Sequence, residues 1–319
     1  MPLQSRWHQL PTEAINPSSL ALDKLSSTEI IDLMLVEDRK MLAAVARERE
    51  RIALAVDIIT QALRKGGRLV FVGAGTSGRL GVLEAAEMPL TFGTEPAMVQ
   101  ALMAGGKVAF FQPGDGAEDR YDEGVRSVAR LKPARRDVFV GVSASGMTSF
   151  VRGGLAAARK AGARIIFVTC DPASELQTFV DLTVALGVGP EVIAGSTRLK
   201  AASATKLVLN MLSTAAMVRI GKTYGNLMVD VQTTSEKLKD RARRIVAIVT
   251  DLERPEVETL LRRAHWNAKA AIVMQKTGLP YARALTRLRR SKGLMRDAIG
   301  EDIEERLRGL LEATTADKR

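Results

Sequence analysis

The 319-residue sequence has little of what disulfides and soft metal sites require. It contains one cysteine, Cys170, and two histidines, His8 and His265, which stand far apart. A single cysteine excludes an intramolecular disulfide, and separated histidines do not form the ligand clusters of zinc sites. We therefore expect no metal site. Cys170 follows an expected strand with no histidine near it in sequence, so we expect a small structural residue and not a nucleophile.

Long apolar runs are also missing. No segment has about 18 consecutive apolar residues, the length that spans a membrane. The N-terminus has no apolar stretch of the kind found in signal peptides. The sequence thus predicts a cytoplasmic protein without membrane attachment.

Aromatic residues make up only 4% of the chain, although the formal net charge is +11. The 47 basic residues are interspersed with 36 acidic ones, a composition that disfavours nucleic acid and favours a small anionic ligand. One basic run contains no acid, and it is typical of a solvated helix face, with an RNA or acidic-partner surface as the alternative. It comprises Arg283, Arg287, Arg289, Arg290, Lys292 and Arg296.

Short apolar runs alternate with helix-forming stretches in the middle of the chain. This alternation predicts an α/β fold with a doubly wound parallel sheet covered by helices on both faces. The expected strands are 68–73, 97–102, 137–143, 164–169 and 182–188, and the helices between them are 77–88, 117–131 and 148–161.

Helices are predicted on both sides of the sheet region. Ser26 is a candidate N-cap, and a second helix is expected from Met41 to Arg64, ending at Gly66-Gly67. A long apolar helix is expected at 198–220, and charged helical stretches at 251–274 and 282–308. We therefore predict three parts: N-terminal leader and helices in 1–65, the sheet domain in 66–230, and a C-terminal helical unit in 231–319.

The first expected strand is followed by a turn rich in glycine and hydroxyl residues, Gly-Ala-Gly-Thr-Ser-Gly-Arg-Leu-Gly at 73–81. Thr76 and Ser77 place hydroxyls at a helix N-terminus, where free N–H groups attract anions. The glycine spacing also fits a dinucleotide site, but the acid that would bind the ribose is missing from 98–104. The Gly-Lys-Ser/Thr ending of a Walker A loop is missing as well.

A second hydroxyl turn follows the strand at 137–143. Ser143, Ser145 and Thr148 surround another expected helix N-terminus, at the strand end where doubly wound sheets bind ligands. Alone, this turn is equally well explained as a helix N-cap. Two such turns in one sheet favour a phosphate site.

With these residues, the chain resembles the N-acetylmuramic acid 6-phosphate etherases, a branch of the sugar isomerase (SIS) superfamily. The glucokinase regulatory protein shares this architecture. Nearly the whole chain takes part in the resemblance, including the leader and the C-terminal helices. The matching strings lie at 73–81, 91–93 (Thr-Phe-Gly), 116–119 (Gly-Ala-Glu-Asp), 188–192 (Val-Gly-Pro-Glu-Val), 195–200 (Gly-Ser-Thr-Arg-Leu-Lys), 209–214 and 224–231.

The resemblance implies removal of D-lactate from C3 of a 6-phosphosugar and addition of water. Glu87 and Glu118 match the catalytic glutamates: Glu87 would protonate the departing ether oxygen, and Glu118 would remove the C2 proton and activate the water. The C1 aldehyde of the open-chain sugar acidifies that proton, so this elimination requires no metal and no redox cofactor. Because the two carboxyls must differ in protonation, we expect Glu87 to be the more buried.

The resemblance also implies a binding site and an assembly. The phosphate is expected on Thr76, Ser77, Ser143, Ser145 and Thr148. The matching strings add Glu191, Ser196, Thr197 and Lys200, which are expected to line the sugar or a subunit interface. Lys200 would offer a positive charge to the anionic substrate, with a surface lysine as the alternative. SIS domains imply a homodimer with its pocket near the interface.

Some positions depart from the etherase pattern and leave alternatives open. Met147 and Ser149 stand where the family has Arg and Pro, and Met88 and Leu90 replace Cys and Pro beside Glu87. These positions flank the expected pocket, so they bear on the leaving group and the N-substituent. The alternatives are a sugar-phosphate-sensing regulatory protein, which needs no acid and base, and a phosphosugar isomerase, which abstracts the C2 proton without elimination.

Overall fold

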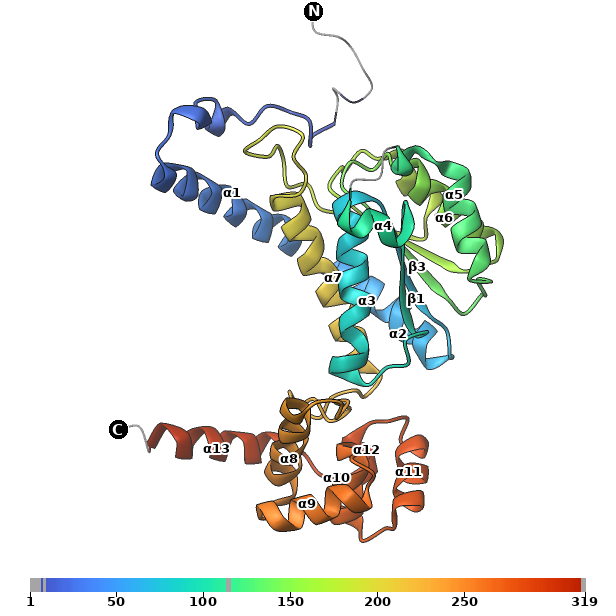
Figure 1. The fold of residues 1–319 in the computed structure, drawn as a ribbon, viewed down its shortest axis with the longest axis vertical. Coiled ribbons are helices and arrows are strands. Elements are labelled where there is room, and N and C mark those ends of the chain that lie inside the picture. The colour runs from blue at the N-terminus through green and yellow to red at the C-terminus, as the bar shows by residue number, and fades with distance from the viewer. Residues whose placement is uncertain (1–6, 8–9, 113–115, 317–319) are drawn as a thin grey trace, which may run out of the picture. The chain divides into compact units, whose positions relative to one another are not determined.

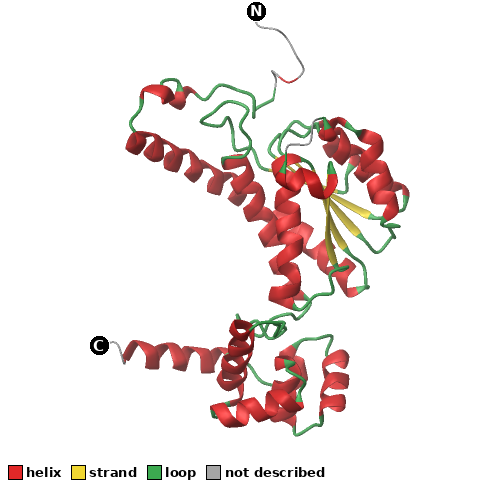
Figure 2. Ribbon diagram, in the orientation of Figure 1, coloured by secondary structure: helices red, strands yellow, loops and turns green. Residues whose placement is uncertain are grey.

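The structure, a computed structural model, describes residues 7, 10–112 and 116–316. These form two compact units. The first comprises the described residues up to Ala86 and from Pro96 to Ala216, and the second comprises Glu87–Glu95 and the described residues from Met217 onward. All the strands of the described residues belong to the first unit, and helices dominate both (Figure 2). The three-part division at residues 65 and 230 stays a prediction.

A five-stranded parallel sheet forms the centre of the first unit, in the order β2-β1-β3-β4-β5. The central strands β1 and β3 are buried along their whole length, because helices cover both faces. The predicted fold class is confirmed, and each predicted strand overlaps an observed one. The strands are β1 (Leu69–Gly73), β2 (Val99–Met103), β3 (Val138–Ser143), β4 (Arg164–Thr169) and β5 (Leu182–Ala185).

Helices lie on both faces of this sheet (Figure 1). On one face, α5 (Tyr121–Arg130) and α6 (Ser149–Lys160) pack closely and share a buried cluster with alternate residues of β1, β3 and β4. The other face carries α2 (Arg49–Arg64), α3 (Gly75–Phe92) and α7 (Lys200–Arg219). Among the described helices, α7 is long and apolar enough to cross a membrane, but half of that stretch is buried, as is typical of a core helix.

The strand order reverses between β1 and β3, which lie side by side in the middle of the sheet. From β1 the chain continues to β2 on one side, and from β3 it continues to β4 on the other. Gly73 at the end of β1 is in register with Val142 near the end of β3. Doubly wound sheets bind ligands at this crevice, so the turns that follow β1 and β3 are placed at the ligand-binding edge.

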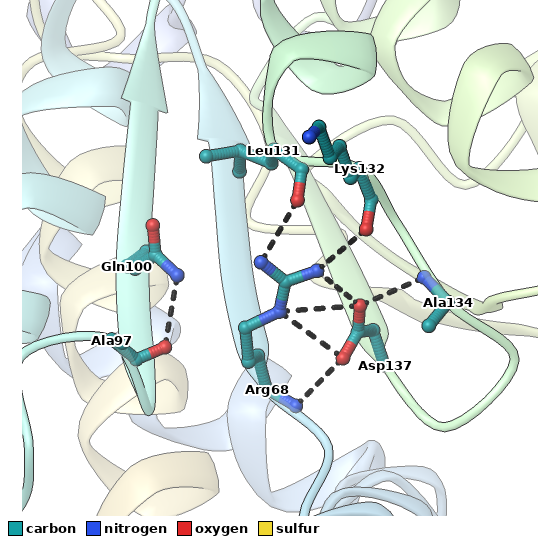
Figure 3. Close-up of polar contacts among 7 residues, drawn as sticks. All are labelled: Arg68, Ala97, Gln100, Leu131, Lys132, Ala134 and Asp137. Atoms are coloured by element: carbon teal, nitrogen blue, oxygen red, sulfur yellow. Dashed lines mark hydrogen bonds and ion pairs between the residues drawn. The ribbon is translucent and has the colours of Figure 1, made fainter.

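At the N-terminal ends of β1 and β3, away from the ligand-binding end, the buried carboxylate of Asp137 holds the two strands together (Figure 3). It accepts hydrogen bonds from the Arg68 guanidinium at 2.6 Å and from the Arg68 backbone N–H at 3.0 Å. The guanidinium also donates to the carbonyl oxygens of Leu131 and Lys132. Burial opposes ionisation of Asp137, but the hydrogen bonds from Arg68 and the Ala134 N–H outweigh it and lower its pKa.

The N-terminal helices differ from the prediction at one point. Helix α1 (Ser27–Arg47) has the predicted N-cap, Ser26, in a capping box with Glu29. The helix expected from Met41 to Arg64 is wrong at its start, because α1 ends at Arg47 and α2 begins at Arg49. Glu48 leaves the helical conformation between them, and its carboxylate accepts a hydrogen bond from the Ala185 N–H of β5.

The second unit is helical and has its own buried core. The stretch expected at 251–274 is divided at His265 and Trp266, whose φ angles are 51° and 60°. Part of the basic run is occupied within the unit, because Arg296 pairs with Asp302 and Glu304. The helices are α8 (Glu236–Thr250), α9 (Arg254–Arg263), α10 (Ala268–Thr277), α11 (Tyr281–Arg290), α12 (Met295–Ile299) and α13 (Glu304–Ala316).

Candidate active site

The turn after β1 is tight, and two of its glycines are required by close backbone contacts. A Cβ on Gly73 would lie 2.8 Å from the Gly78 nitrogen, and one on Gly78 would lie 2.9 Å from the Gly73 oxygen. Helix α3 begins at Gly75, so Thr76 and Ser77 are in its first turn, where both side chains are partly exposed. The two hydroxyls are therefore accessible beside unpaired N–H groups of the helix.

The turn after β3 also presents hydroxyls at a helix N-terminus. The Ser143 and Thr148 hydroxyl oxygens are 2.8 Å apart, and Ser143 is buried whereas Thr148, the N-cap residue of α6, is partly exposed. The Ser145 hydroxyl accepts a hydrogen bond from the Met147 N–H at 3.4 Å. In this arrangement Ser143 is positioned to orient the Thr148 hydroxyl.

Glu118 lies in a short 3-10 helix, η4 (Ala117–Asp119), and its side chain is exposed. The α-helix expected to begin there starts instead at Tyr121. The neighbouring Ala117 is buried in the same cluster as Ala74 of the first turn and Phe150 of α6. This packing holds the Glu118 backbone beside the elements that carry both hydroxyl turns.

Glu87 lies on α3, three turns of helix beyond the first hydroxyl turn, and its side chain is also exposed. Both glutamates are exposed, so the expected difference in burial between Glu87 and Glu118 stays a prediction. Of the two departures beside it, Met88 is buried and Leu90 is exposed.

One turn before Glu87, α3 carries a buried glutamate, Glu84, whose burial was not predicted from the sequence. Glu84 is only 2% exposed, and its carboxylate accepts hydrogen bonds from Asn210 at 2.8 Å and from Ser213, both on α7. The Lys206 ammonium lies 3.8 Å from the same carboxylate. The polar residues at positions 206, 210 and 213 recur at helical spacing on α7, which is a signal for a shared polar partner. This network fixes α3 against α7.

Arg79, in the first matching string, is held by backbone carbonyl groups. Its guanidinium donates to the carbonyl oxygens of Ala109 and Phe110, both at 2.8 Å. These carbonyls are in the last turn of α4 (Gly106–Phe111), a short helix that the sequence interpretation missed. Arg79 therefore stabilises the C-terminal end of α4.

Lys200 is neither a free cation for the substrate nor a surface lysine, and both interpretations are corrected. Its side chain is 2% exposed, and its ammonium lies 2.6 Å from the carboxylate of Glu37 on α1. Burial opposes ionisation of Glu37, but hydrogen bonds from Lys200 and Lys40 outweigh it and lower the pKa of Glu37. The ion pair joins the start of α7 to α1.

Glu191 caps the N-terminus of α7. Its carboxylate oxygens accept hydrogen bonds from the Lys200 N–H at 3.2 Å and the Ala201 N–H at 2.9 Å. Burial raises the pKa of Glu191 despite these hydrogen bonds, which act in the opposite direction. Ser196 and Thr197 lie in the partly exposed segment before α7.

A cleft of about 750 Å³ opens beside the second hydroxyl turn. Gly146, Met147 and Ser149 line it, so two of the departures from the family pattern face this space. The opposite wall is the segment that follows β4, and Tyr121 and Arg152 contribute from α5 and α6. None of the five predicted phosphate-binding hydroxyl residues lines the cleft.

Cys170 is buried, and desolvation raises the pKa of its thiol to about 12, which confirms the structural role predicted for it. Within residues 7, 10–112 and 116–316, no group of three or more His, Cys, Asp and Glu side chains could hold a metal ion.

Comparison with known proteins gives matches over nearly the whole chain. The N-acetylmuramic acid 6-phosphate etherase of Microcystis aeruginosa is 47% identical over 296 residues, which is 93% of this chain and 96% of that protein. The N-acetylmuramic acid 6-phosphate etherase 2 of Vibrio cholerae is 47% identical over 92% of this chain and 96% of its own. The model of the glucokinase regulatory protein N-terminal SIS domain matches residues 51–159.

Solved structures similar to this one include a phosphoheptose isomerase from Francisella tularensis and the Vibrio vulnificus NanR protein complexed with ManNAc-6P. The first is 18% identical with a TM-score of 0.48, covering 61% of this chain and 100% of that chain. The second is 18% identical with a TM-score of 0.42, covering 74% of each chain. Given the identity to its relatives over nearly its whole length, the chain belongs to the N-acetylmuramic acid 6-phosphate etherase family of carbon–oxygen lyases.

Proposed function

We propose that the chain cleaves the D-lactyl ether of N-acetylmuramic acid 6-phosphate by elimination and hydration. The products are N-acetylglucosamine 6-phosphate and D-lactate. The observation that carries the proposal is the identity to etherases over nearly the whole chain, with both glutamates retained. The two hydroxyl turns at the β1/β3 edge supply the phosphate site that such a substrate needs.

The reaction follows from the acidity of the C2 proton in the open-chain sugar. Glu118 removes that proton, the electron pair forms the C2–C3 double bond, and the C3–O bond breaks while Glu87 gives its proton to the departing lactate oxygen. Glu118 releases the C2 proton to solvent and then takes a proton from water as the hydroxide adds to C3. It returns a proton to C2, and Glu87 is reprotonated from solvent. The chemistry balances without a metal or redox cofactor.

The phosphate is assigned to the hydroxyls of Thr76, Ser77, Ser145 and Thr148, with Ser143 behind them. Partial exposure of the first four side chains and the N-terminus of α6 support this assignment. Ser196 and Thr197, which are partly exposed, are proposed to line the sugar or a subunit interface. Glu191 is proposed to support them by capping α7. Lys200 has no place in the binding site, because Glu37 occupies its ammonium.

Isotope exchange separates the two glutamate roles. With N-acetylmuramic acid 6-phosphate in deuterium oxide, Glu87→Gln should lose lactate release by about 10²- to 10⁴-fold but still exchange the C2 proton of the recovered substrate. Glu118→Gln should lose both. Asp119→Asn, an exposed neighbour, is the control and should retain both activities. Full C2 exchange by Glu118→Gln would refute the role of Glu118 as base.

The same assay decides between the lyase and the alternatives. A sugar-phosphate sensor would bind the compound and yield neither exchange nor lactate. A phosphosugar isomerase would exchange C2 without releasing lactate. Only the lyase produces D-lactate in proportion to N-acetylglucosamine 6-phosphate.

We also propose a cytoplasmic homodimer. Supporting the dimer, α1 leaves Ile31, Leu35 and Val36 between 51% and 56% exposed, an apolar surface that a second copy would cover. Light scattering coupled to gel filtration should give a dimer for the native chain and a monomer for Leu35→Asp. A native monomer would refute the assembly.

A further inference from the structure

The proposed substrate carries two anionic groups, the phosphate at C6 and the carboxylate of the lactyl ether at C3. The hydroxyl turns account for the phosphate. With Lys200 paired to Glu37, the sequence interpretation leaves the carboxylate without a cation. If the proposed function holds, another basic residue has to bind this second anion.

Basic side chains near the two turns are mostly occupied. Arg79 donates to the carbonyl oxygens at the end of α4. Lys206 pairs with Asn210 and lies near Glu84. Arg152 differs from both, because its guanidinium has no hydrogen bond or ion pair to any residue that the structure describes, and it lines the cleft beside the second turn.

Arg152 is placed close to the phosphate turn. Its backbone N–H donates to the carbonyl oxygen of Thr148 at 3.1 Å, so the two residues are one helical turn apart at the start of α6. Side chains on a helix tilt toward its N-terminus, which brings the guanidinium toward Met147 and Ser149 at the mouth of the cleft.

The cleft also lies close to the proposed base. Tyr121, which lines it, is three residues beyond Glu118. The start of α5 touches α6 beside Arg152, since a Cβ on Gly153 would lie only 2.1 Å from the Tyr121 carbonyl oxygen. C2, from which the base takes a proton, is bonded to C3, which carries the lactyl ether. A cation near Glu118 is therefore well placed for the lactyl carboxylate.

Acidic groups in the cleft do not neutralise Arg152. Asp171 is 4% exposed, and its carboxylate accepts a hydrogen bond from the Ala173 N–H at 2.9 Å. Glu175 lies on the wall formed by the segment after β4 and is exposed. It can accept hydrogen bonds from sugar hydroxyl or amide groups while Arg152 faces the carboxylate.

We propose that the cleft between α6 and the segment after β4 is the subsite for the lactyl group, and that Arg152 binds its carboxylate. A guanidinium suits this role because it donates two parallel hydrogen bonds to a carboxylate. Met147 supplies an apolar surface for the lactyl methyl. Arg152 thus determines specificity for the ether, and the hydroxyl turns bind the phosphate that substrate and product share.

The test compares the substrate with the sugar product, which has the phosphate and no carboxylate. In Arg152→Met, the KM for N-acetylmuramic acid 6-phosphate should rise about 10- to 100-fold with kcat little changed, as expected when a charged hydrogen bond is lost equally from ground and transition states. The inhibition constant of N-acetylglucosamine 6-phosphate should stay the same. Arg152→Lys should recover part of the affinity as a point charge.

Lys160→Met, at the exposed C-terminal end of the same helix, is the matched control and should leave both constants unchanged. If the Arg152→Met substitution weakens substrate and product equally, Arg152 acts on the phosphate or on the fold, and the proposal fails. An unchanged KM also overturns it. Absence of lactate release by the native protein would instead refute the proposed function itself.

Discussion

Replacing Lys200 by methionine should destabilise the first unit, because it removes one half of a buried ion pair. The Lys200 and Glu37 side chains are 2% and 3% exposed, and their charged atoms are 2.6 Å apart. Removing one partner of a buried pair costs about 3–5 kcal/mol, whereas replacing both by apolar residues of similar volume is often close to neutral.

The structure predicts that the two single substitutions differ in size. After Lys200→Met, Glu37 still has Lys40 as a partner, whose side chain is 54% exposed, so the cost should be near the lower limit of about 3 kcal/mol. After Glu37→Leu, the buried Lys200 ammonium has no other acceptor among the described residues, so the cost should be near about 5 kcal/mol. The double variant should recover most of the loss.

The pH dependence of the pair has a defined sign. The pKa of Glu37 is lowered in the folded chain, so its stabilisation is present above the unfolded value of about 4.3 and is lost as pH falls through the folded value. The difference in unfolding free energy between the native chain and Lys200→Met should therefore shrink below about pH 4.

Amide hydrogen exchange measured by mass spectrometry gives the free energy of opening of each unit separately, so it can measure the loss of stability in the first unit. Amides of β3 and β4 report opening of the first unit, and amides of α10 in the second unit provide an internal reference. Arg198→Met, an exposed position two residues away, is the control and should change stability by less than about 0.5 kcal/mol. If Lys200→Met leaves the sheet amides unchanged and raises the KM for the phosphosugar, Lys200 is a substrate contact after all.

Three further predictions concern other buried groups. Asp137→Asn should lower the unfolding free energy by about 2–3 kcal/mol at pH 7, measured by urea unfolding. The pKa of Asp137 is lowered in the folded chain, so the difference between the two proteins should vanish as pH falls through the folded-state pKa. A difference that stays constant with pH would contradict the ionic role of Asp137. Cys170 should not react with a thiol reagent in the native protein and should give one reactive thiol in urea, because burial raises the pKa of its thiol to about 12. Glu84→Ala should cost about 2–4 kcal/mol, because it leaves Asn210 and Ser213 without their acceptor, and thermal unfolding that matches the native protein would refute the network.

The sequence predicted what depends on local patterns. Alternating apolar runs predicted the five strands, and the capping residues Ser26 and Gly66 were recognisable from their types. Helix α4 was missed because it has only 6 residues and begins at a glycine, so it has no amphipathic repeat to detect. The break at Glu48 was missed because its cause is a hydrogen bond to Ala185, 137 residues away in sequence.

The parts of the candidate site that depend on local backbone geometry were predictable from the sequence. The parts that depend on side-chain partners far away in the sequence were not. The hydroxyl turns follow from strand ends and glycines, which are visible in sequence. Lys200 was misinterpreted because its partner, Glu37, is 163 residues away, and a lysine in a family string is compatible with either role. Burial of Glu84 depends likewise on α7, more than 120 residues downstream.

These partners indicate what the matching strings around α7 do. Lys200, at the end of one string, pairs with Glu37 of α1, and Glu191, from another, caps α7. Asn210 and Ser213, from a third, hold Glu84 of α3. None of these four contacts needs a ligand, yet each fixes a helix beside the sheet, and α3 carries both the first hydroxyl turn and Glu87. Similarity in these strings therefore reflects how the proposed catalytic helix α3 is placed. The specificity for the lactyl group has to lie elsewhere, and we assign it to the cleft, where Met147 and Ser149 depart from the family pattern and Arg152 lines the wall.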